Sequence, residues 1–147
     1  MGLVKAIFVG NLLVTGFLTG LIWYVQIVHY PLLAQIGVGE FARYHAAHST
    51  LTTRVVALPM LLELGLSGAL LLYRPVGLAP AFAWAGFALA MAVWLCTFFV
   101  SVPLHSQLGA GHDVAVIGRL VATNWLRVVA WSAHLALLGW ALVRVLP

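Results

Sequence analysis

Four long apolar stretches constrain the fold of this chain more than any other feature of its sequence. A helix needs about 20 largely apolar residues to cross the hydrocarbon core of a bilayer, and each stretch meets that length. Because lipid offers no hydrogen-bond partners, a segment inside it must satisfy its own backbone groups, as a helix does. We therefore predict an all-α, polytopic membrane four-helix bundle with up-down-up-down topology. The stretches run roughly over Ala6–Val28, Thr50–Leu72, Ala81–Val102 and Leu120–Leu142.

The composition argues against a soluble domain. Of the 147 residues, 64% are hydrophobic and 7% are charged, whereas a soluble domain carries about 25% charged residues. The connections between the stretches are short, so we expect residues 1–147 to form a single transmembrane domain. The first stretch follows Lys5, as a signal peptide would, but its apolar run is too long and no small-residue cleavage site follows it. We expect it to be retained as a helix.

The basic residues bear on orientation rather than on nucleic acid. They form no Lys/Arg patch, so no nucleic-acid partner is expected. With four crossings, both termini lie at one end of the bundle, the terminal side, and the first and third connections lie at the other, the loop side. Lys5, Arg74 and Arg144 flank helices on the terminal side, whereas Arg43 and Arg119 lie on the loop side. By the positive-inside rule this small bias predicts cytoplasmic termini, in what we expect to be a bacterial inner membrane.

Histidines gather at the loop-side ends of the predicted helices. His29 ends the first helix, His45 and His48 begin the second, and His105 follows the third. Residues three apart on a helix are neighbours, so the imidazoles of His45 and His48 can reach one metal ion or two adjacent ones. Neutral imidazole suits copper, zinc, iron and nickel. We predict a metal site made by these four histidines; the alternative is that they lie at the membrane interface and face the lipid headgroups.

Further polar residues are expected around this site. Gln26, Tyr44 and Asn124 could orient the imidazole N–H groups or contact a cofactor. Arg127 shares a helix face with Asn124 and with Trp131, which would line a pocket. The expected role of Arg127 is to bind an anionic substrate, and the alternative is that it extends to the headgroups. Arg54 falls on the helix face opposite the histidines.

A second polar layer is expected deeper in the membrane. Glu63 lies about 22 Å along its helix from His48, at 1.5 Å per residue, so the two cannot share a mononuclear site. Asn11, Thr15 and His134 are expected at a comparable depth. An ionisable residue inside a membrane is costly and indicates function. We expect Glu63 and His134 to form either a proton-carrying pair or a hydrogen-bonded structural pair.

Prolines and a short repeat bear on the shape of the helices. Pro31 disfavours helix at Tyr30, so the first helix is predicted to end there, and Pro59 is predicted to kink the second helix. The segment "RVVA" occurs at residues 54–57 and again at 127–130. Each copy enters the second helix of a hairpin, which favours a duplication of two helical hairpins.

Several of these segments carry a resemblance. The segments "WYVQIVHYP", "FARYHAAHS", "PMLLE", "VPLH" and "NWLRVVAW" resemble segments of small four-helix bacterial membrane proteins of unassigned activity. The general layout is also similar to that of anthrone-oxygenase-like membrane proteins, which oxidise polycyclic aromatic substrates. The resemblance implies an oxidative activity and carries over no site residues.

The sequence thus predicts a membrane-embedded oxidoreductase that acts on a lipophilic small molecule. Its cofactor would be iron or copper held by the four histidines, or alternatively haem b held by two of them. Arg127 and Asn124 would bind the substrate or a water on the metal, and Glu63 and His134 would carry protons. Two alternatives belong to other classes: a non-catalytic accessory or assembly subunit of a larger membrane complex, and a channel or transporter that would need to form a homo-oligomer.

Overall fold

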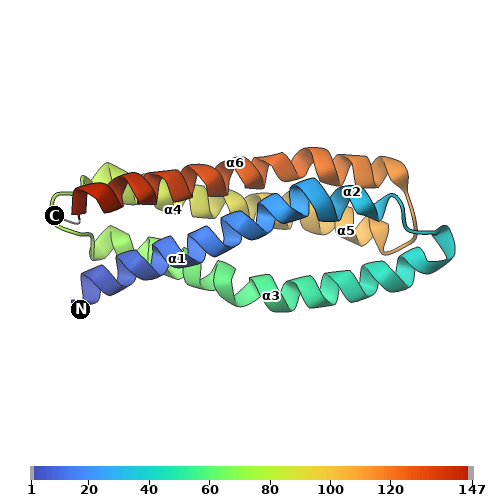
Figure 1. The fold of residues 1–147 in the computed structure, drawn as a ribbon, viewed down its shortest axis with the longest axis horizontal. Coiled ribbons are helices and arrows are strands. Elements are labelled where there is room, and N and C mark those ends of the chain that lie inside the picture. Colours follow the sequence, from blue (N-terminus) through green and yellow to red (C-terminus); the bar gives the residue numbers. More distant parts are fainter. Residues whose placement is uncertain (1, 146–147) are drawn as a thin grey trace.

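The computed structural model describes residues 2–145 as an all-α bundle of four long spans (Figure 1). The spans run alternately up and down, and both termini lie at the same end (Figure 1). The predicted architecture is therefore confirmed. In chain order the elements are α1 (Leu3–Tyr24), the π-helical turn η1 (Val25–His29), α2 (Tyr30–Leu33), α3 (Val38–Leu72), α4 (Pro80–Cys96), the π-helical turn η2 (Thr97–Ser101), α5 (Val102–Leu108) and α6 (Val114–Val145).

The bundle has apolar side chains outside and a mixture of apolar and polar side chains inside. Each span packs against two others, α1 against α3 and α6, and α4 against α3 and α6. The outer surface carries large exposed hydrophobic residues, for example Leu13, Leu58 and Phe99. Buried polar residues lie inside, Asn11 and Glu63 among them. This distribution suits a lipid solvent, and all four spans are long and apolar enough to cross a membrane, which are the features of an integral membrane protein.

The first span does not end at Tyr30, as Pro31 had suggested, but continues to Leu33. A proline inside an α-helix removes one backbone hydrogen bond and its ring collides with the carbonyl four residues earlier. Here the wide turn η1 directly precedes α2, in which Pro31 occupies the first turn. The i→i+5 geometry inserts an extra residue and accommodates the proline without ending the helix. The third span repeats this arrangement, with η2 before Pro103 in α5.

The two hairpins consequently share one order of elements. Each has a long helix, a π-helical turn, a short helix with proline at its start, and then a second long helix. This common order supports the duplication inferred from the "RVVA" repeat. The second helices differ in shape, because α3 contains Pro59 and bends about midway along its length (Figure 1). Towards the loop side α3 diverges from the other three spans (Figure 1).

Candidate functional site

Four imidazoles meet at the loop side of the bundle, and together they form what we call the histidine cluster. His29 Nε2 lies 2.7 Å from His48 Nδ1, and His45 Nε2 lies 3.0 Å from His105 Nδ1. The ring centroids of His48 and His105 are 5.6 Å apart, which joins the two pairs. The cluster therefore draws on three of the four spans, at the level that the sequence predicts.

Local structure orients each ring. His29 is the last residue of η1, and His105 lies in α5, beyond η2. His45 and His48 lie one turn apart in α3, where the Thr52 hydroxyl is 3.1 Å from His48 Nδ1. The Phe41 ring stacks on His45 at a centroid distance of 5.8 Å. His45 is 4% exposed, so its imidazole faces the protein rather than the lipid headgroups.

The Tyr30 phenol joins the histidine cluster to Arg127, and the sequence analysis missed it. Tyr30 is buried, and its hydroxyl lies 3.0 Å from His105 Nε2 and accepts a hydrogen bond from Arg127 Nη2 at 3.1 Å. Arg127 also donates from Nε to Asn124 Oδ1 at 2.9 Å. Asn124 in turn donates to Gln26 Oε1 at 2.8 Å. A continuous chain of polar contacts thus runs from α6 to the cluster.

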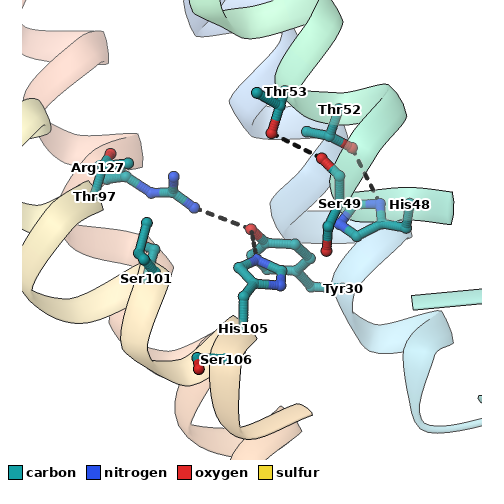
Figure 2. Close-up of a pocket in the computed structure, with 11 residues that line it drawn as sticks. Tyr30, His48, Ser49, Thr52, Thr53, Thr97, Ser101, His105, Ser106 and Arg127 are labelled. Atoms are coloured by element: carbon teal, nitrogen blue, oxygen red, sulfur yellow. Dashed lines mark hydrogen bonds between the residues drawn. The ribbon is translucent and has the colours of Figure 1, made fainter. Parts of the chain in front are cut away.

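A pocket of about 410 Å³ opens beside this chain of contacts, between α3 on one side and η2, α5 and α6 on the other (Figure 2). Arg127 and Tyr30 line it together with His48 and His105 (Figure 2). The remaining lining is mostly hydroxyl-bearing, from Ser49, Thr52, Thr53, Thr97, Ser101 and Ser106. We call this cavity the hydroxyl pocket. It reaches the outside of the bundle, because Thr53 and Ser106 are exposed.

Three residues predicted to support the histidines do something else. Gln26 and Asn124 are buried, and Asn124 donates to Gln26 and accepts from Arg127. Gln26 itself donates to the Val121 carbonyl. Tyr44 is 43% exposed. It lies in the first turns of α3, and it makes no hydrogen bond to a histidine of the cluster among residues 2–145. The loop residue His112 lies outside the cluster; its Nε2 is 3.4 Å from the Ala34 carbonyl oxygen.

The deeper layer forms around the Glu63 carboxyl, which is fully buried. Trp131 Nε1 donates to Oε2 at 2.8 Å, and the Thr15 hydroxyl donates to Oε1 at 3.2 Å. His134 Nδ1 lies 3.0 Å from Oε1. The predicted pairing of Glu63 with His134 is therefore present, and Trp131 joins it. His134 Nε2, the other ring nitrogen, is buried and has no hydrogen-bond partner in the part of the chain that the structure describes.

The cluster gathers side chains of a type that can bind a metal, but the described residues are not arranged as a metal site. Among the described residues, no three His, Cys, Asp or Glu side chains converge on a common point. Its nitrogens instead face one another in two pairs, at 2.7 and 3.0 Å. Both distances are those of a hydrogen bond in which one imidazole donates an N–H to the other.

Comparison of the chain with family models, with curated proteins and with solved structures finds no match. The chemistry of the site therefore has to be inferred from its own residues.

Proposed function

We propose that the protein is a membrane-embedded oxidoreductase that holds a transition metal, iron or copper, in the histidine cluster and acts on a lipophilic small molecule. The observation that carries this proposal is the meeting of four imidazoles, with nitrogen pairs 2.7 and 3.0 Å apart, at one end of an otherwise apolar bundle. Four interfacial histidines facing headgroups would have no reason to pair their nitrogens inside the protein. Imidazole nitrogens are common ligands of both metals.

The surrounding side chains suit such a site. A bound iron or copper ion would supply the electron transfer. The Thr52 hydroxyl beside His48 and the Phe41 ring on His45 would hold the imidazoles in orientation. The Tyr30 phenol, between His105 and Arg127, would hold a proton within reach of the cluster. The hydroxyl pocket would admit a substrate from the bilayer, since its mouth lies between membrane-spanning helices.

The haem alternative fits the cluster less well. Two axial histidines must leave room for a macrocycle between their rings. The His29 and His48 rings are in direct contact, with centroids 4.3 Å apart, and the His45 and His105 rings are 5.3 Å apart. A bound haem would have to separate one of these pairs.

For the orientation, we propose cytoplasmic termini in a bacterial inner membrane. On the loop side Arg43 is ion-paired with Glu40. On the terminal side Lys5, Arg74 and Arg144 have no acidic neighbour in sequence. The positive-inside rule favours the side with more basic residues.

Metal analysis tests the proposed function directly. The protein would be purified in detergent without a histidine tag, and its metal content would be measured by mass spectrometry beside a His45→Ala/His48→Ala double variant. The matched control is His112→Phe, which removes a loop imidazole outside the cluster and keeps a ring against Phe41. We expect near-stoichiometric iron or copper in the wild type and the control, and loss of the metal in the double variant.

The other outcomes point to the alternatives. A Soret band in the wild type that is absent from the double variant would indicate that the cluster holds haem b and not a single metal ion. No metal and no haem in a folded wild-type protein would overturn the proposal and favour the accessory-subunit reading, which predicts a stable partner after mild detergent extraction.

A further inference from the structure

We propose that the hydroxyl pocket binds the anionic end, a carboxylate or phosphate, of a lipophilic molecule that enters from the bilayer. Arg127 would pair with the anion, and the unpartnered hydroxyls of the pocket would donate to it. That the bound molecule is the substrate rests on the proposed function. That the pocket binds an anion rests on the residues of the pocket alone.

The first support is the charge of Arg127. Its side chain is 8% exposed inside a membrane-spanning helix, and its hydrogen bonds go to a neutral amide and a phenol. All three acidic residues of the chain are engaged elsewhere. Glu40 pairs with Arg43, Glu63 contacts His134, and Asp113 accepts from the backbone at the start of α6. A buried guanidinium without a counter-charge is costly, so an anion in the adjacent pocket would stabilise it.

The second support is independent of charge and comes from two hydroxyls. Ser49 Oγ and Thr97 Oγ1 both line the pocket, and both are buried without a hydrogen-bond partner among the described residues. Ser49 lies in α3 and Thr97 begins η2, so the two approach the cavity from opposite walls (Figure 2). Buried polar atoms are nearly always satisfied in native proteins, and each exception calls for an explanation. Carboxylate and phosphate oxygens, which accept several hydrogen bonds, would satisfy both.

The third support is the apolar cavity that adjoins the pocket. Tyr30, Thr52 and Arg127 line both spaces, and the rest of the second cavity is almost wholly apolar, including Leu18 and Met60. A molecule with its anion at Arg127 therefore has apolar surface beside it. The atoms next to the anion would lie near His48 and His105, which also line the pocket. The apolar cavity is about 50 Å³, which admits only the few atoms next to the anionic group, so the rest of the hydrocarbon would lie in the bilayer.

Binding of oleate tests this inference. Radiolabelled oleate would be bound to the protein in phosphatidylcholine nanodiscs, with empty nanodiscs subtracted, and displaced by oleyl alcohol or by 1-oleoyl lysophosphatidate. We expect the neutral alcohol to compete at least about 10-fold less well than oleate, because it lacks the charge that Arg127 would pair with. Stronger competition by lysophosphatidate than by oleate would assign the site to phosphate, and the reverse order to carboxylate.

Two arginine variants provide the matched comparison. Arg127→Gln is expected to weaken oleate binding by about 10-fold or more. Arg54→Gln, in the equivalent "RVVA" segment of the other hairpin, should leave it unchanged, because Arg54 is exposed and lines no part of the pocket. Equal oleate binding by the wild type and by a folded Arg127→Gln variant would overturn the inference.

A third variant keeps the test decisive if Arg127→Gln does not fold. Thr97→Val replaces the hydroxyl by a methyl group of similar size. Because Thr97 Oγ1 has no hydrogen-bond partner within residues 2–145, its removal should leave stability unchanged or raise it. Oleate binding should nevertheless weaken several-fold. Undiminished binding by this variant would count against the inference.

Measuring binding before and after chelation separates this inference from the proposed function. If the protein binds the anion but contains no metal as purified, the binding site would be supported and the proposed oxidoreductase would be contradicted. If the protein contains stoichiometric metal but binds oleate and oleyl alcohol equally, the proposed function would be supported and the anion site would be contradicted.

Discussion

Glu63 is the acceptor on which the deep polar layer depends, and its replacement by leucine should destabilise the bundle. The carboxyl is fully buried, accepts from Thr15 and Trp131, and would also accept from His134 if Nδ1 carries the proton. Leucine would fill similar space but accept nothing. All three donors would be left without this acceptor in the membrane interior. Hydrogen bonds between membrane helices contribute about 0.6 kcal/mol each on average, so three of them give a loss of about 2 kcal/mol.

The loss can be measured by unfolding the protein with dodecyl sulfate in mixed micelles, followed by circular dichroism. Glu63→Gln retains one carbonyl oxygen and should lose about half as much, roughly 1 kcal/mol. Glu40→Gln is the control, because that acid is exposed and pairs only with Arg43. If Glu63→Leu were as stable as the wild type, the hydrogen-bonded structural role would be refuted, and the proton-carrying role would be the remaining reason for the residue.

Two further predictions concern the deep layer and the cluster. A Cβ on Gly86 would lie 3.1 Å from His134 Nε2, so Gly86→Ala should destabilise the bundle by about 1–3 kcal/mol in the same unfolding assay. Gly139→Ala, where a Cβ meets nothing within 4 Å, should be neutral or slightly stabilising, and equal effects of the two would contradict this packing argument. A metal in the histidine cluster should be retained at pH 8 and released as the pH falls, because protons compete with the metal for the imidazole nitrogens. Dialysis at stepped pH followed by metal analysis measures this, and a metal content that did not change from pH 8 down to about pH 2 would contradict imidazole ligation.

Depth in the membrane could be predicted from sequence because it increases linearly along a helix. The four spans, the common level of the histidines and the lower level of Glu63 all follow from counting residues at 1.5 Å each. Helix faces could also be predicted where the helix is unbroken. In α6 the expected face of Asn124, Arg127, Trp131 and His134 is buried throughout. Arg54, expected on the outer face of its helix, is exposed.

The direction in which a side chain points could not be predicted for residues that follow a π-helical turn. Each such turn adds one residue relative to an α-helix and so rotates everything after it by about 100°. Tyr30 and His105 lie beyond η1 and η2, and a helical wheel drawn from the start of the span misplaces both. The signal that could have identified Tyr30 is its place between His29 and Pro31, at a site where the backbone must depart from α geometry. The exposure of Tyr44 could not be predicted either, since it depends on how α3 packs against the other spans.

The two π-helical turns also mean that the number of residues around each turn can be used to recognise functionally related sequences. A related sequence that lacked one residue between Gln26 and Pro31 would keep the same hydropathy profile and the same four crossings. Its Tyr30 equivalent would face another direction, and the link from Arg127 to the histidines would be lost. Residue spacing at these two turns, rather than overall likeness, should therefore separate homologues that share this chemistry from those that share only the bundle.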